Sequence, residues 1–259
     1  MKKIYLTLVL LSLLFACPNV LKSQDETSTR SEKPIFKRNL IKVNLTGLAL
    51  RNYGLQFEEV LNKRISVALA YRIMPSGNIP FKTFITSRSN NSQSAEDALN
   101  AIKLGGSALT ADLRFYLGKK GYGRGFYISP FYRHATFNAN GLNFDYTDIN
   151  NQSAVIDLSG NLSSNTVGLM LGSQWFIGKK LCIDWWIIGP HYGTAHGIFL
   201  AHTNVALDQL EQESIRSSLS TFDIPFTKES YTVSANEIKL SLDGPWAGIR
   251  AGIQLGFRF

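Results

Sequence analysis

Eight charged residues occupy alternate positions within segments that are otherwise apolar or small. They are five cations and three acids: Lys42, Glu58, Arg72, Asp112, Arg114, Asp184, Arg250 and Arg258. Successive side chains of a β-strand point to opposite faces, so these charges would share one face and their apolar neighbours the other. A charge buried alone is costly, which means that charges on an interior face must pair. The pattern predicts an interior charge network, and the excess of cations leaves a narrow anion-preferring path as the alternative.

The final segment, residues 246–259, is the clearest strand that could position such charges. Its odd-numbered residues from Ala247 to Phe259 are all apolar, whereas the even-numbered residues between them are glycine, arginine or glutamine. The segment is longer than the ~5–6 residues of a usual globular strand and matches the ~9–11 tilted residues that cross a bilayer. It predicts a membrane-crossing strand or, alternatively, an amphipathic edge strand of a soluble β-sandwich.

Seven earlier segments alternate in a similar way. These predicted strands cover residues 41–50, 53–60, 65–73, 108–117, 126–137, 166–176 and 181–192. The fifth is interrupted by Pro130, which predicts a bulge or a kink at that point. In the seventh, strict alternation places Ile188 on the same inward face as Asp184.

The connections between the predicted strands alternate in length. They are short at 61–64, 118–125 and 178–180, and long at 74–107, 138–165 and 193–245. Within the long segments, a capping box predicts a short helix at 94–104, and residues 207–215 have weak helical spacing. Bacterial outer-membrane barrels have an even number of strands, short periplasmic turns and longer external loops. Residues 39–259 are therefore predicted to be all-β: an eight-stranded antiparallel transmembrane β-barrel with long extracellular loops and both termini in the periplasm.

The N-terminal residues have the parts of a secretory signal peptide. Two lysines precede an apolar stretch over residues 4–16, which is too short to span a membrane as a helix. Residues 1–23 are predicted to be the signal peptide, and 24–38 a flexible periplasmic segment. Two processing routes remain open, namely cleavage before Gln24 or cleavage before a lipidated Cys17.

Composition and charge narrow the expected surroundings. Charged residues make up 18% of the chain, below the ~25% of typical soluble domains. The net charge of +8 includes three lysines of the predicted signal peptide; from Gln24 onward, 24 basic and 19 acidic residues leave +5. This mildly basic character favours contact with anionic outer-membrane lipid and lipopolysaccharide. A secreted chain with no recognition motif is not expected to bind nucleic acid. Cleavage before Gln24 would leave Cys182 as the one cysteine, so no internal disulfide is expected.

Five short motifs lie in the predicted strands. They are KVNL at 42–45, LQFE at 55–58, LRFYL at 113–117, FYI at 126–128 and LGFRF at 255–259. Together they resemble the small outer-membrane β-barrel proteins of Bacteroidetes-type bacteria, a family catalogued as a domain of unknown function. The resemblance implies a barrel in the cell outer membrane, with no catalytic residue and no cofactor. It also implies that Phe257 and Phe259 form the signal read by the barrel-assembly machinery during insertion.

The sequence also contains one pattern typical of a catalytic site and one typical of a metal site. His134 and Thr136 share a face near the end of the fifth predicted strand, which resembles the histidine and hydroxyl of lipid A-modifying barrels. Those deacylases carry a serine followed by a glutamate, and this chain lacks both at the matching positions. His191, His196 and His202 cluster in sequence, but a loop supplies no fixed ligand geometry. Neither an enzyme nor a metal site is predicted.

The long segments at 74–107 and 193–245 exceed the length of ordinary connections, which indicates a role of their own. The sequence therefore predicts a barrel with a side-chain-plugged lumen that acts as a structural or interaction module. Its external loops would support envelope integrity or dock a surface, secretion or fimbrial component or a glycan. The alternatives are the narrow anion-preferring pore and a lipid A-modifying enzyme.

Overall fold

The computed structural model describes residues 37–78, 101–147, 153–221 and 223–259 of the chain. The predicted signal peptide, both predicted cleavage sites and most of the predicted helix at 94–104 lie outside these residues. Within them, most of the chain forms one antiparallel β-sheet.

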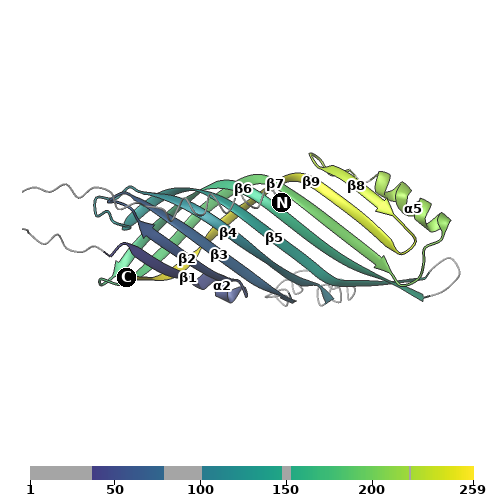
Figure 1. The fold of residues 1–259 in the computed structure, drawn as a ribbon, viewed down its shortest axis with the longest axis horizontal. Coiled ribbons are helices and arrows are strands. Elements are labelled where there is room, and N and C mark those ends of the chain that lie inside the picture. Colours follow the sequence, from purple (N-terminus) through teal and green to yellow (C-terminus); the bar gives the residue numbers. More distant parts are fainter. Residues whose placement is uncertain (1–36, 79–100, 148–152, 222) are drawn as a thin grey trace, which may run out of the picture. The chain divides into compact units, whose positions relative to one another are not determined.

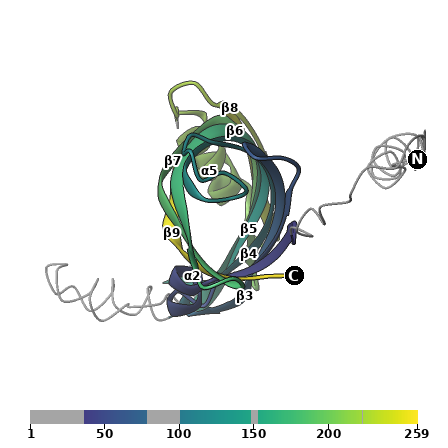
Figure 2. The ribbon, with the colours of Figure 1, turned by 90° about the vertical axis from the view of Figure 1, so that its left-hand side faces the viewer.

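The sheet closes on itself. In chain order the elements are β1 (Asn39–Asn44), α2 (Leu45–Ala49), β2 (Tyr53–Val60), β3 (Ile65–Asn78), β4 (Lys103–Tyr116), β5 (Gly125–Thr147), β6 (Ser153–Ile177), β7 (Leu181–Thr203), α5 (Gln209–Ser220), β8 (Lys228–Val233) and β9 (Glu237–Arg258). Eight strands form a ring in the order β1-β2-β3-β4-β5-β6-β7-β9, because β9 pairs with both β7 and β1. β8 pairs with the part of β9 that β1 does not reach. The predicted all-β, eight-stranded antiparallel closure is therefore confirmed, as Figure 1 shows from the side and Figure 2 from one end.

The two ends of the ring differ. At the turn end, short connections at 61–64, 117–124 and 178–180 join neighbouring strands. The first and last strands also meet there, where the Phe259 amide donates to the Asn39 carbonyl at 2.9 Å. At the other end, β5, β6, β7 and β9 continue well past the short strands β1 and β2 (Figure 1). This extended end comprises residues 138–147, 153–165, 193–221 and 223–246.

Apolar side chains cover the outside of the ring, and polar side chains fill much of its inside. Outward-facing residues such as Leu69, Leu169 and Ile253 are exposed, whereas lysine, arginine, glutamate, aspartate and glutamine side chains are buried within. One apolar cluster also lies inside and consists of Tyr116, Tyr127, Phe131, Met170 and Trp186. In the part of the chain that the structure describes, no helix has the length and apolar character required to cross a bilayer.

The first strand ends earlier than the sequence predicts. The predicted strand covered 41–50, but β1 stops at Asn44 and the helix α2 follows. The Asn44 side chain accepts a hydrogen bond from the Gly47 amide at 2.7 Å, which caps the first turn of α2. Arg51 then adopts a φ of 55° as the chain turns into β2. Because Asn44 caps α2, residues 45–49 form a helical turn and not the end of the predicted strand.

Two of the segments predicted as long loops are mostly regular structure. β5 continues to Thr147 and β6 starts at Ser153, so the segment 138–165 is largely a strand hairpin. In the segment 193–245, β7 continues to Thr203, and α5, β8 and the first part of β9 follow. Their asparagine- and serine-rich composition is typical of loops, but the strands satisfy each other's backbone groups. The weak helical spacing at 207–215 lies largely within α5, which covers Gln209–Ser220.

A bulge in β7 changes which residues face inward. The pairing of β7 with β9 shifts register between Trp186 and Gly189. One residue is inserted, so the alternation reverses beyond it. Ile188 consequently faces outward and is exposed, and the prediction that it faces inward is wrong. His191 faces the interior instead of the outside.

β5 shows the opposite behaviour at Pro130. Its pairing with β6 keeps one register from Gly125 to Ala139, so the predicted bulge at Pro130 is wrong. The pairing with β4 is interrupted there, between Phe131 and Ile128. The alternation therefore continues unbroken, and Phe131 and Arg133 are both buried inside the ring.

Candidate functional site

Four of the predicted interior charges meet in one buried network. Lys42 of β1 forms ion pairs with Glu58 of β2 and, at 2.7 Å, with Asp184 of β7. Arg114 of β4 pairs with the same two carboxylates, at 3.2 Å from Glu58 and 2.7 Å from Asp184. All four side chains are almost completely buried. Two cations face two acids, so the network is balanced in charge.

Hydroxyl groups occupy further hydrogen-bonding positions of the two carboxylates. Tyr116 and Ser66 donate to Oε1 of Glu58 at 2.7 and 2.6 Å. Tyr127 donates to Oδ1 of Asp184 at 2.8 Å. The four charged residues and these three hydroxyl residues are called the ionic plug below. Its bonds join strands across the lumen, and charge-assisted bonds of this kind are short and directional.

Another ion pair lies next to the four of the plug. Arg250 of β9 pairs with Asp112 of β4 at 3.2 Å, and Gln56 donates to the other oxygen of Asp112 at 3.3 Å. The guanidinium carbon of Arg250 also lies 4.4 Å from the ring centroid of Phe131 and 4.6 Å from that of Trp186. Asp112 is therefore engaged by two donors, and Arg250 is held between two aromatic rings.

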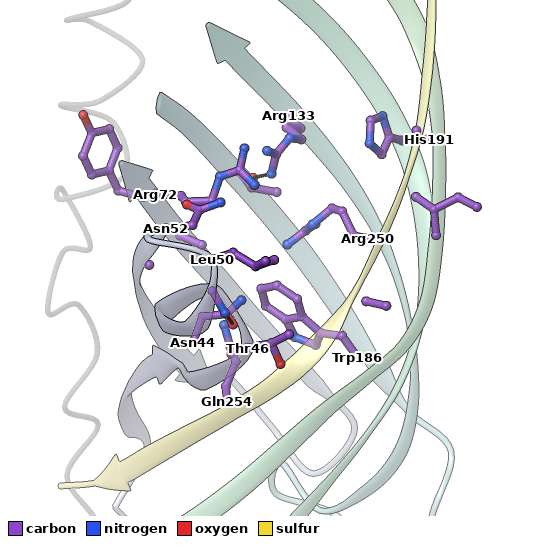
Figure 3. Close-up of a pocket in the computed structure, with 18 of the residues that line it drawn as sticks. Asn44, Thr46, Leu50, Asn52, Arg72, Arg133, Trp186, His191, Arg250 and Gln254 are labelled. Atoms are coloured by element: carbon purple, nitrogen blue, oxygen red, sulfur yellow. Dashed lines mark hydrogen bonds between the residues drawn. The ribbon is translucent and has the colours of Figure 1, made fainter. Parts of the chain in front are cut away.

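Arginine side chains from three strands line a cavity of about 310 Å³ beside this pair. Arg72, Arg133 and Arg250 point toward a common space, and His191 of β7 lies near it (Figure 3). This cavity is called the arginine pocket. Arg133 donates to the hydroxyl of Thr110 over a long 3.4 Å. Arg72 has no ion pair within the described residues, and its Nε has no hydrogen-bond partner there.

The arginine pocket lies where the ring loses one strand. β1 pairs with β2 only as far as Val43 and with β9 only as far as Asn44. Beyond that level, α2 contacts both β2 and β9 and occupies the place of a strand. The lining of the pocket includes residues of α2 together with the outward-facing Leu55 and Ile249. The cavity thus borders both the interior of the ring and its outer surface.

The remaining predicted residues lie at the turn end. Arg258 is buried; its Nη2 donates to the carbonyl of Tyr122 at 2.6 Å, and its guanidinium lies 3.6 Å from the ring centroid of Phe176. Phe257 and Phe259 are exposed on the outward face. Their role as an assembly signal stays a prediction.

His134 and Thr136 have separate partners. Nδ1 of His134 lies 2.9 Å from Oδ1 of Asn165, and the Thr136 hydroxyl lies 3.0 Å from that of Ser107. The histidine ring is exposed on the outer face of β5. Nothing in these contacts aligns the histidine with the threonine hydroxyl.

The other histidines are also separated. His191 borders the arginine pocket, His196 contacts Asp243 at 2.8 Å, and His202 lies 3.6 Å from Glu237. Among the described residues, no group of three potential metal ligands lies together.

Arg133 and His191 line the arginine pocket but were not among the predicted interior residues. Arg133 was missed because Pro130 obscured the pattern, although alternation carried forward from Tyr127 would have placed it inside. His191 could not be placed, because the sequence has no clear signal for the bulge in β7.

Neither a family model nor a curated protein matches this sequence. The resemblance to small outer-membrane barrels therefore stays an expectation based on the motifs.

Proposed function

We propose that this chain is an outer-membrane β-barrel protein with a plugged lumen, acting as an interaction module through its extended end. The observation that carries the proposal is the reversed distribution of side chains, with large apolar residues exposed around the ring and charges buried inside. Contiguous apolar surface of this kind is unusual on a monomeric soluble protein. Lipid would cover it, and a closed ring avoids the unpaired strand edges that lipid cannot satisfy.

Aromatic residues at two levels of the outer face support the membrane assignment. Exposed tyrosines lie toward the extended end, and exposed tryptophan and phenylalanine residues lie toward the turn end. The two sets are Tyr53, Tyr71, Tyr132 and Tyr192, and Phe126, Trp175, Trp185 and Phe257. Transmembrane barrels carry aromatic girdles of this kind at both membrane interfaces, with an apolar band between them.

The ionic plug favours a closed lumen over the narrow anion-preferring pore. A barrel of eight strands has an interior just wide enough for side chains. Here the interior holds four paired charges and a cluster of aromatic side chains. A continuous water path would have to pass through groups that are already hydrogen-bonded to each other.

The extended end supplies a surface suited to docking. The helix α5 begins with a capping box between Asp208 and Glu211, and Arg216 donates to the carbonyl of Val233 at 2.9 Å. The Arg216 contact joins α5 to β8. Such a platform is suited to a surface, secretion or fimbrial component or a glycan.

Orientation and conductance test the proposal together. Cysteines introduced as Ser217→Cys in α5 and Lys120→Cys in a turn, in a Cys182→Ser background, are treated with a membrane-impermeant maleimide on intact cells. We expect labelling at position 217 only, and no steady conductance of the purified protein in planar bilayers. Recovery of the protein in the soluble fraction would refute the membrane assignment. Stable anion-selective channels would replace the plugged lumen with the pore.

A further inference from the structure

We infer that the arginine pocket binds the anionic headgroup, phosphate or carboxylate, of an amphiphilic molecule whose apolar tail lies along the outer face of the ring. The inference goes beyond the docking role of the extended end. The headgroup site depends only on the contacts below, whereas the placement of the tail in lipid rests on the proposed function.

The first support is the charge surplus around the pocket. Three guanidinium groups and His191 face one region, and Asp112 is the one described acid paired with any of the three arginines. The carboxylates of Glu58 and Asp184 are already paired with Lys42 and Arg114 in the plug. Arginines held together without enough acids repel one another, and an oxyanion would offset this repulsion. Guanidinium groups bind phosphate and carboxylate with paired, directional hydrogen bonds.

The second support is a set of buried polar atoms without partners in the described residues, all on residues that line the pocket. Arg72 Nε and Trp186 Nε1 are donors, whereas Asn52 Oδ1 and Gln254 Oε1 are acceptors. Buried polar atoms are nearly always hydrogen-bonded in folded proteins. The anionic oxygens of a headgroup would accept hydrogen bonds from the two donors, and its hydroxyl or amine groups would donate to the two acceptors.

The third support is the route out of the pocket. Leu55 and Ile249 line the same cavity as the arginines, and they are 53% and 71% exposed on the outer face. The opening lies where β1 ends and α2 takes its place in the wall. A ligand can therefore hold its head among the arginines while its tail leaves sideways, without passing the ionic plug. A volume of about 310 Å³ accommodates a headgroup and leaves the tail outside.

The experiment measures binding to the purified full-length chain in a neutral detergent by calorimetry. The probes are decyl phosphate, inorganic phosphate and decyl maltoside, which separate the amphiphilic anion, the free anion and the apolar tail. We expect saturable binding of decyl phosphate, about tenfold or more tighter than inorganic phosphate, and no specific binding of decyl maltoside. Equal affinity for the two phosphates would overturn the amphiphile and leave a soluble anion as the ligand.

Variants assign the binding to the pocket. Arg72→Met and Arg133→Met should each weaken decyl phosphate binding about tenfold or more, because a charge-assisted hydrogen bond is lost. Neither arginine belongs to the plug, and removal of either relieves repulsion, so the melting temperature of the ligand-free variants should be unchanged or raised. The control is Arg64→Met, which changes an exposed arginine in a turn and should bind as the unaltered chain does.

Unchanged binding in both pocket variants, or no saturable binding of either phosphate, would refute the site. A lower melting temperature of both ligand-free variants would also count against it, because it would give the arginines a structural role. These outcomes are independent of the labelling and conductance results, so failure of this inference is distinguishable from failure of the proposed function.

Discussion

Replacement of Arg114 by methionine should destabilise the barrel by about 3–5 kcal/mol, because it leaves two buried carboxylates with one cation. Arg114 contributes half of the ion pairs in the plug, at 2.7 Å from Asp184 and 3.2 Å from Glu58. Its Nη2 also donates to Oε1 of Gln56 at 3.0 Å. Methionine retains much of the side-chain volume, so the loss of charge and hydrogen bonds dominates the change.

Asp184, one of the two carboxylates paired with Arg114, allows a double-mutant cycle. Asp184→Asn alone would leave a surplus cation, whereas Arg114→Met with Asp184→Asn leaves Lys42 and Glu58 as a balanced pair. Residues in one buried network couple by about 0.5–3 kcal/mol. The double variant should therefore cost less than the sum of the two single variants, by an amount in the upper part of that range.

The free energy of unfolding can be measured by urea titration in lipid vesicles, with tryptophan fluorescence as the signal. Arg64→Met is the matched control, because Arg64 is exposed in a turn, and its effect should stay within about 0.5 kcal/mol. A loss of less than about 1 kcal/mol for Arg114→Met would show that water screens these charges. Strict additivity in the cycle would likewise refute a coupled plug.

Two further changes test the closing strand and the interior packing. Phe259→Asp should lower the amount of protein assembled in the outer membrane, as measured by membrane fractionation. The control Phe226→Asp, at an exposed loop position, should not lower it. Equal yields of the two variants would refute the assembly signal. Gly172→Ala should destabilise the fold by about 1–3 kcal/mol in the same urea assay, because the added Cβ would lie 2.3 Å from Cζ of Tyr127. Gly118→Ala, whose added Cβ would meet its nearest atom at 3.5 Å, is the control and should be nearly neutral.

Alternation along the chain predicted the inward face of most charged residues and, together with the alternating connection lengths, the closed eight-stranded ring. The reason is local, since the period of two in a strand depends only on backbone geometry. The polar strands of the extended end could not be predicted in this way. Their residues resemble a loop in composition, and only pairing between β5, β6, β7 and β9 makes them strands.

The sequence by itself therefore determined that charges such as Lys42, Glu58 and Asp184 lie inside a β-barrel, but only the tertiary structure decided which of them pair. Ion pairs such as Lys42 with Asp184 depend on how strands distant in sequence are placed around the ring, such as β1 beside β9. The lining of the arginine pocket depends on two further features, namely the end of β1 at the capping residue Asn44 and the bulge of β7. The end of β1 opens the wall beside Arg72, Arg133 and Arg250, and the bulge turns His191 toward the same cavity.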